Sequence, residues 1–358
     1  MNDENPRQIA ARVLRQRESS QEFTENLLES ALARSPLSPP DRGLCLEMVY
    51  GVVRWQATLD WLIARKTGGR PQKPALQNVL RLGLYQLFWL DRIPAHAAVH
   101  ESVEMAKRSG YASQSGFINA VLRGCLREVD AIKQQLADLK TQQPALGYSQ
   151  PDWLVQRWQK QFGAENTHRL LEWNNRPPRT FARVNTLKSA MGGKATVEQA
   201  SAALLTRWRE ENVEYDFFTR DWTGENLIFE LKSHPPLLSL PSFRDGRFYV
   251  QDPSTLLAVA RLGARPGESI LDLCAAPGGK TTFIAQHMQD QGRLLATDLA
   301  EDRLALIREN CERLGISCVQ IGLVSSLNQE STGAGFDRIL VDAPCSNSGV
   351  LRRRVDLR

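Results

Sequence analysis

A glycine-containing turn after the apolar run Ser269 to Leu273 is the first segment of the chain that could bind a cofactor. Between a strand and a helix, glycine lets the backbone approach a ligand closely, and the helix N-terminus favours an anionic group. The turn lacks the complete phosphate-binding and dinucleotide-binding glycine patterns. We therefore expect a nucleotide that carries a carboxylate rather than a pyrophosphate. The residues assigned to this cofactor are Cys274, Ala275, Ala276, Pro277, Gly278, Gly279 and Lys280.

Asp298 is the next candidate, because it ends a second apolar run that begins at Arg293. An acidic residue in this place can accept hydrogen bonds from both ribose hydroxyls of an adenosine. The alternative is that Asp298 caps the helix that follows it. The glycine-containing turn that precedes it favours the ribose role.

Asp342-Ala343-Pro344-Cys345 is the third candidate, at the end of the apolar run Arg338 to Val341. Pro344 stiffens the turn and should hold Cys345 over the cofactor pocket. A lone cysteine near a strand end is more often a small apolar filler. The position of this run after the two cofactor segments favours a chemical role for both Asp342 and Cys345.

The elements that must position these residues alternate between strand and helix from about Pro253 onward. Four strands are predicted, and a parallel, doubly wound sheet follows from this alternation. The carboxyl ends of parallel strands meet at one edge, so the three candidate segments should converge there. The predicted strands are residues 269–273, 293–298, 318–321 and 338–342.

The preceding part of the chain divides into three predicted segments. Residues 1–132 show apolar positions at three- and four-residue steps and form a helical domain of five to seven helices. Polar residues and Pro144 suggest a linker over 133–150. Residues 151–245 mix helical and strand signals and are predicted to form a small α+β domain. The last domain, 246–358, is the doubly wound one.

A basic stretch begins at Asn174 and contains no acid before Val197. Alternation along the strand predicted over 179–185 would place arginine side chains and an aromatic ring on one face, where they could contact phosphates and stack on a base. The alternative is a solvated basic edge strand. The predicted RNA-binding residues here are Arg176, Arg179, Phe181 and Arg183.

Composition narrows the class of protein without deciding it. The chain has 358 residues, 42% of them hydrophobic, and a net charge of +5. No apolar stretch approaches the roughly 20 residues of a membrane span. The six cysteines show no metal-ligand spacing, so we expect reduced thiols, no metal and a cytoplasmic location.

Residues 240–358 resemble the catalytic domain of the NOL1/NOP2/Sun family of RNA cytosine-C5 methyltransferases, through the glycine turn and the Asp342–Cys345 run. Ile93 to Val99 and Phe117 to Arg123 resemble the NusB-like RNA-binding domain that precedes the catalytic part in bacterial Sun (Fmu) members. Tyr249 to Ser254 resembles the segment that leads into the catalytic core. The resemblance covers nearly the whole chain.

The resemblance implies a function and a set of roles. S-adenosylmethionine would be the cofactor, and cytosine C5 in ribosomal RNA, with 16S rRNA expected, would be the methylated atom. Cys345 would help to release the product, and Asp342 would lie against the cofactor and the base. Asn119 and Arg123 of the NusB-like run become RNA-binding candidates. The complete protein is expected to be a monomer.

Two features of the chain depart from the family pattern. The family nucleophile is a second cysteine in a Thr-Cys-Ser run after the fifth strand, and these 358 residues do not contain it. A chain truncated before that run is expected to expose its fourth strand as an apolar edge. Gly322-Leu323 replaces a family Gly-Asp that contacts adenine, and the lost hydrogen bond would weaken cofactor binding by about 1 kcal/mol.

Two other functions are compatible with parts of this sequence. One is an RNA-binding fragment without catalytic activity, because the nucleophile run is absent. The other is a methyltransferase for an exocyclic amine or a glutamine. Such enzymes carry Asn/Asp-Pro-Pro-Tyr/Phe where this chain has Asp342 to Cys345, which argues against the second.

Overall fold

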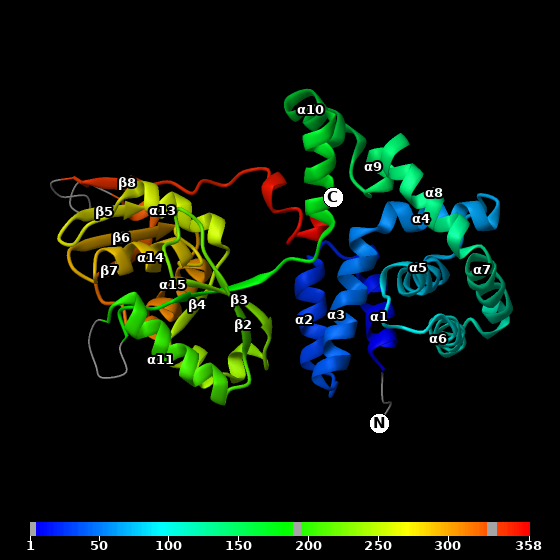
Figure 1. Cartoon of the computed structure of the whole chain (residues 1–358), viewed down its shortest axis with the longest axis horizontal. Helices are drawn as coiled ribbons and strands as arrows, with labels where there is room; N and C mark the ends of the chain where they lie inside the picture. The colour runs from blue at the N-terminus through cyan, green and yellow to red at the C-terminus, as the bar shows by residue number, and fades with distance from the viewer. Residues whose placement is uncertain (1–4, 189–194, 328–334) are drawn as a thin grey trace. The chain divides into compact units, whose positions relative to one another are not determined.

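The computed structural model describes residues 5–188, 195–327 and 335–358, and it divides the chain into two compact units (Figure 1). The first unit contains residues 1–178 and 347–358, and the second contains residues 179–346. Contacts group the helix at 152–175 and the last twelve residues with the first unit. The domain boundaries expected from the sequence, after residues 132, 150 and 245, stay a prediction.

The first unit is a bundle of α-helices, seven of which lie within the predicted helical domain. Asn5 and Ser38 cap the first and third helices through their side chains, as short polar residues do. The helices are α1 (Pro6–Ser19), α2 (Thr24–Ala33), α3 (Pro39–Arg54), α4 (Gln56–Thr67), α5 (Pro74–Trp89), α6 (Ala95–Arg108), α7 (Ser115–Arg127), α8 (Val129–Gln142), α9 (Pro144–Gly147) and α10 (Asp152–Asn175).

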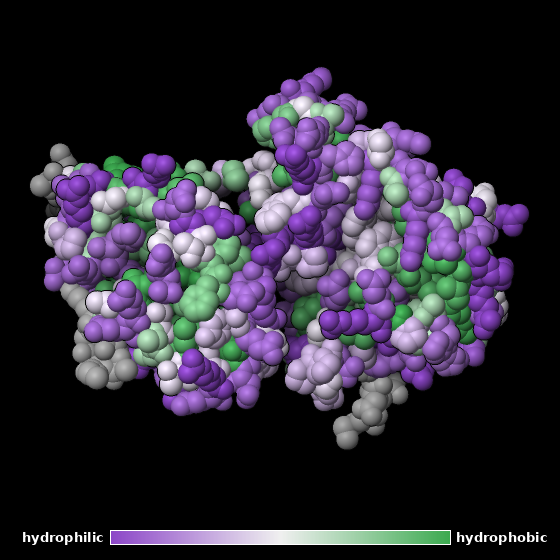
Figure 2. All heavy atoms as spheres, viewed as in Figure 1, coloured by the Kyte–Doolittle hydropathy of each residue, from purple (hydrophilic) through white to green (hydrophobic). Residues whose placement is uncertain are grey.

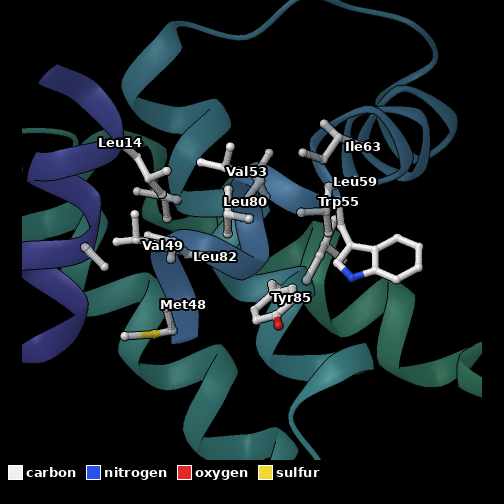
Figure 3. Packing of buried hydrophobic residues seen from close by; sticks show 14 of the residues in the cluster. Leu14, Met48, Val49, Val53, Trp55, Leu59, Ile63, Leu80, Leu82 and Tyr85 are labelled. Atoms are coloured by element: carbon white, nitrogen blue, oxygen red, sulfur yellow. The ribbon is translucent and has the colours of Figure 1, made fainter. Parts of the chain in front are cut away.

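One continuous hydrophobic core holds these helices together. Leu14 of α1, Val49 of α3 and Leu80 of α5 point toward one another in the close view (Figure 3). Gly51 lets α5 approach α3, because a Cβ atom there would lie 1.9 Å from the ring of Tyr85. The same core includes Trp158 of α10, which explains why this helix joins the first unit.

The predicted linker at 133–150 is helical. Helix α8 covers its first part and α9 its second, and Pro144 stands at the first position of α9, where a proline costs no hydrogen bond. Ile132 and Leu139 are buried, so α8 has an apolar stripe that packs on the bundle. The polar residues that suggested a linker form the solvent face of α8.

The segment after Asn347 also packs on the helical bundle. Leu351 and Val355 are buried in its core. The Asp356 carboxylate accepts hydrogen bonds from the Thr24 backbone N–H (2.8 Å) and the Arg17 Nε–H (2.9 Å). Arg358 donates to the carbonyl of Asn174 at the end of α10, and Figure 1 shows the C-terminus beside that helix.

Asp356→Ala is expected to destabilise the helical unit by about 1–3 kcal/mol, because the buried Thr24 N–H and hydroxyl would lose their acceptor. Urea unfolding followed by far-ultraviolet circular dichroism measures this loss. Glu165→Ala is the matched control, because Glu165 is an exposed acid on α10. Equal midpoints for the two variants would contradict the prediction.

The second unit begins with a small antiparallel sheet in the order β2-β3-β1-β4. Helix α11 (Val197–Glu210) packs on it through the buried Trp208, which contacts the rings of Phe229 and Phe248. The prediction had omitted β2, whose residues are mainly exposed or half-buried. The strands are β1 (Thr180–Val184), β2 (Glu214–Phe218), β3 (Ile228–Ser233) and β4 (Phe248–Val250), and a short α12 (Pro241–Arg244) precedes β4.

The rest of the second unit is a parallel sheet in the order β7-β6-β5-β8, which confirms the doubly wound prediction. Its strands are β5 (Ser269–Asp272), β6 (Arg293–Asp298), β7 (Val319–Leu323) and β8 (Arg338–Leu340), and its helices are α13 (Leu256–Leu262), α14 (Gly279–His287) and α15 (Glu301–Leu314).

Strand β8 is an edge of this sheet in the described part of the chain. It pairs with β5 on one side, and Ile339 and Val341 are each more than half exposed. The expected apolar edge is therefore present.

Elsewhere the face of the molecule in Figure 2 is mainly hydrophilic, with hydrophobic residues scattered over it. Among the described helices, none is long and apolar enough to cross a membrane.

Candidate active site

The glycine-containing turn lies where β5 ends and α14 begins. The Ala275 N–H donates to the carbonyl of Thr297 in β6 (2.9 Å), and the Gly278 N–H donates to the carbonyl of Ala275 (2.8 Å). The Ala276–Pro277 peptide bond is cis. Gly278 has a φ of 99°, which L side chains rarely adopt, so glycine is required there. The turn thus presents the N-terminus of α14, with its unpaired amides, to the cavity.

Asp298 supports this turn from the end of β6. Its carboxylate is buried and accepts hydrogen bonds from the backbone N–H groups of Ala276 (3.0 Å) and Leu299 (2.8 Å). Arg303 Nε lies 2.9 Å from it. Helix α15 begins after Ala300 without a side-chain cap, so the alternative of a helix-capping Asp298 is wrong.

Asp272 is a site residue that the sequence analysis missed. It ends β5, is fully buried, and accepts a hydrogen bond from the Thr281 hydroxyl through Oδ2 (2.7 Å). Its Oδ1 has no hydrogen-bond partner among the described residues. Burial raises the pKa of Asp272 to about 6, and the charges of Asp342 and Asp298 add to this. The position of Asp272 at the end of the predicted strand, just before the glycine turn, could have identified it from the sequence.

Asp272 should make the stability of the cofactor-free protein depend on pH. Its folded-state pKa of about 6 lies above the unfolded value of about 3.9, so the stabilising effect of protonation is complete below pH 4 and disappears as pH rises through 6. Asp272→Asn keeps an acceptor for Thr281 and removes the charge. We expect this variant to be more stable than the parent by up to ~3 kcal/mol at pH 7.

Denaturant unfolding of parent and Asp272→Asn at pH 4 and pH 7 measures this difference. The gain should be present at pH 7 and vanish at pH 4. An equal difference at both pH values would show that the Asp272 carboxyl does not titrate between them.

Asp342 and Lys280 form an ion pair across the mouth of the site. Asp342 follows β8, and Lys280 lies in the first turn of α14, so the pair joins the first and third candidate segments. Cys345 is exposed and lies three positions beyond Asp342. Cys274 is a less suitable nucleophile, because burial and the charges of nearby carboxylates raise the pKa of its thiol.

Arg183 has a different place from the one predicted. Its guanidinium is buried beneath the glycine turn and donates to Gln251 Oε1 (2.6 Å), the Gly279 carbonyl (3.0 Å) and Thr282 Oγ1 (2.9 Å). Burial lowers the pKa of Arg183 to about 9, which still leaves it charged at pH 7. Arg183 therefore connects the small sheet to the cofactor turn and is not available for a phosphate.

The predicted RNA-binding face of β1 is wrong for Phe181 as well. Phe181 is buried, because β1 lies in the middle of the sheet between β3 and β4 and both its faces are covered. Arg179 is exposed and forms an ion pair with Glu230, and Arg176 is exposed at the end of α10. Lys194, also in the predicted basic stretch, lies outside the described residues.

Asn119 and Arg123 lie one turn apart on the surface of α7. Arg123 Nε donates to Asn119 Oδ1 (2.9 Å). Their RNA-binding role stays a prediction.

A cavity of about 220 Å³ lies over the glycine turn, and residues of the turn and Asp342 both line it. Gly278, Asp298 and Cys345 are not part of its lining. Four lining residues belong to Tyr249 to Ser254, the segment noted from the sequence only as a resemblance, and Thr255 follows it. The lining residues are Tyr249, Val250, Gln251, Asp252, Thr255, Cys274, Ala275, Ala276, Pro277, Gly279, Lys280 and Asp342.

Comparison with protein families assigns both units of the chain. Residues 4–127 match the NusB family, residues 150–204 match the ferredoxin-like domain of RsmF/B-like methyltransferases, and residues 259–358 match the 16S rRNA methyltransferase RsmB/F family. A curated relative from Synechocystis, "Probable ribosomal RNA small subunit methyltransferase B", is 38% identical over 98% of this chain and 77% of its own length. The chain belongs to the RsmB/F methyltransferase family.

Other RsmB/F relatives agree with this assignment. The ribosomal RNA small subunit methyltransferase B of Escherichia coli O1:K1 is 34% identical over 99% of this chain and 78% of its own length. The crystal structure of PH0851 has the same fold, with a TM-score of 0.69 at 22% identity over 98% of this chain and 77% of that one. The RsmB/F architecture is thus a NusB-like helical domain, a ferredoxin-like domain and a parallel-sheet methyltransferase domain.

In the described residues, no group of His, Cys, Asp and Glu side chains could hold a metal.

Proposed function

We propose that this protein transfers a methyl group from S-adenosylmethionine to C5 of a cytosine in small-subunit ribosomal RNA, and that it does so in the cytoplasm. The observation that carries this proposal is the junction of the glycine turn, Asp298 and Asp342 at the carboxyl end of the sheet of an RsmB/F-family chain. The curated relatives are ribosomal RNA small subunit methyltransferases by name.

The charges at this site suit a positively charged cofactor. Three carboxylates, those of Asp272, Asp298 and Asp342, surround the turn, and Asp298 and Asp342 are paired with Arg303 and Lys280. Among the described residues, Asp272 Oδ1 accepts no hydrogen bond. S-adenosylmethionine, when bound, supplies an electrophilic methyl group on a sulfonium and has an ammonium group that favours such surroundings. The first-turn amides of α14 would hold its carboxylate, and Asp298 its ribose.

We further propose Cys345 as the residue that assists product release and Asp342 as the residue that orients the base. Addition of a thiolate to C6 makes C5 of cytosine nucleophilic. After methyl transfer a base must remove the C5 proton so that the C5–C6 double bond re-forms and the thiolate leaves C6, and Cys345 would assist this step. A gene that carries Cys345→Ala should therefore give a covalent protein–RNA adduct in cells. A thiol-dependent, slowly migrating band on a denaturing gel is the expected result, and its absence would refute the release role.

Bisulfite sequencing of small-subunit ribosomal RNA from cells with and without the gene tests the reaction itself. One cytosine should lose its protection when the gene is deleted, and the gene should restore it. An unchanged protection pattern together with retained RNA binding would support the RNA-binding alternative without methyl transfer.

A further inference from the structure

An exposed tryptophan on the first half of α10 is unusual for the surface of this protein. Trp153 is 64% exposed, whereas Trp158, on the same helix, is 7% exposed and belongs to the core. Leu154 and Val155 turn into the core with Trp158, so α10 is fixed on the bundle by its other face. A large apolar side chain that is left in solvent on a firmly packed helix marks a binding surface more often than a packing defect.

The side chains around Trp153 are basic or amide. A shallow groove of about 420 Å³ is lined by Trp153, Gln156, Arg157, Lys160 and Gln161. Positions 153, 157 and 160 follow one another at four- and three-residue steps, which puts them on one face of the helix. With a rise of about 1.5 Å per residue, the two cations lie roughly 6 and 10 Å along the axis from the ring. No acid occurs between Trp153 and Ala164, and the exposed Asp152 and Glu165 flank this stretch at its two ends.

This combination identifies the chemistry of the partner. An exposed indole offers a face on which a nucleobase can stack, and adjacent cations can neutralise the backbone phosphates of the same strand. The two glutamines can exchange hydrogen bonds with base edges. An apolar protein partner would use the ring but would gain nothing from the two positive charges beside it. We propose that Trp153, Arg157 and Lys160 form a single-stranded RNA-binding platform outside the methyltransferase site.

The platform rests on the proposed function, because it would hold an unpaired segment of the ribosomal RNA substrate. It is separate from the candidate active site, since Trp153 and α10 belong to the first unit and the glycine turn to the second. Substitutions on α10 should therefore change RNA affinity, and the Michaelis constant for RNA, without changing the affinity for S-adenosylmethionine.

Fluorescence anisotropy with a labelled single-stranded RNA oligonucleotide tests the platform. Trp153→Ala should weaken binding by about tenfold, the usual effect of removing one stacked base, and Trp153→Phe should recover part of it. The double variant Arg157→Ala/Lys160→Ala should lower the slope of log affinity against log salt by about 1.4, because two phosphate contacts are lost. Trp153→Ala should leave that slope unchanged.

Two control variants separate this surface from general effects. Phe23→Ala removes another exposed ring, and Lys107→Ala removes another exposed cation; both should bind RNA like the parent. If Trp153→Ala, folded by circular dichroism, binds RNA as tightly as the parent, the platform is refuted. A change in oligomeric state of Trp153→Ala instead of a change in RNA affinity would identify a protein contact and would also refute it. If the parent itself binds no RNA, the proposed function fails and not only the platform.

Discussion

Arg183→Met is expected to destabilise the second unit by about 3 kcal/mol and to weaken S-adenosylmethionine binding. Methionine fills much of the same volume but donates no hydrogen bond. Gln251 Oε1 would lose its buried donor, and the Gly279 carbonyl would lose one donor and keep the Thr282 hydroxyl. Each unsatisfied acceptor costs about 1–3 kcal/mol. Removal of the buried positive charge should by itself stabilise the folded unit, because the guanidinium has no carboxylate among its hydrogen-bond partners to offset the cost of burying it. We expect the lost hydrogen bonds to dominate, since three charge-assisted bonds disappear together.

Thermal unfolding measures the first effect, and titration calorimetry with S-adenosylmethionine measures the second. Arg179→Met is the matched control, because Arg179 directly precedes β1, is half exposed, and forms a surface ion pair with Glu230 worth less than about 1 kcal/mol. Arg183→Lys keeps the positive charge, but an ammonium group cannot reach the three acceptors as the planar guanidinium does. This variant should therefore keep only part of the affinity for S-adenosylmethionine. Parent-like stability and affinity in Arg183→Met would show that the residue does not position the cofactor turn.

Asp298→Ala is expected to weaken S-adenosylmethionine binding by about a hundredfold. Two hydrogen bonds from ribose hydroxyls to a carboxylate contribute ~1.5–3 kcal/mol each, and the Ala276 N–H would also lose the acceptor that holds the turn. In this structure Arg303 Nε forms an ion pair with Oδ1 of the Asp298 carboxylate. Bound ribose should displace it, because Arg303 is half exposed and free to move into solvent.

Calorimetry on Asp298→Ala and Arg303→Ala distinguishes the ribose role from a purely structural one. Arg303→Ala keeps the carboxylate and removes its competitor, so its affinity for S-adenosylmethionine should equal or exceed that of the parent. Equal affinity of Asp298→Ala and the parent would refute the ribose assignment. Reduced affinity in both variants would instead indicate that the ion pair itself maintains the site.

Local patterns in the sequence predicted the elements that depend on local contacts. Helical periodicity predicted the helices of residues 1–132, and strand–helix alternation predicted a parallel, doubly wound sheet, whose order β7-β6-β5-β8 came from the structure. The glycine turn was placed correctly because Gly278 must adopt a positive φ wherever such a turn joins strand and helix. The same reasoning brought Asp342 to the turn, since parallel strands end at one edge.

Tertiary structure decided which faces of these helices and strands are buried against other segments and which are exposed to water. The alternation of Arg179, Phe181 and Arg183 is the same whether these side chains meet water or protein. Only the fold buries Phe181, and Arg183 against α14, while Arg179 stays exposed. Polar residues of α8 gave a linker signal because its apolar stripe is narrow, with Ile132 and Leu139 facing a bundle formed by distant residues. Asp356 and Thr24, which lie at opposite ends of the chain, meet only after folding. The sequence by itself therefore determined most of the elements and the chemistry of the turn. Burial, and with it the role of each charged residue, depended on contacts between segments far apart in the chain.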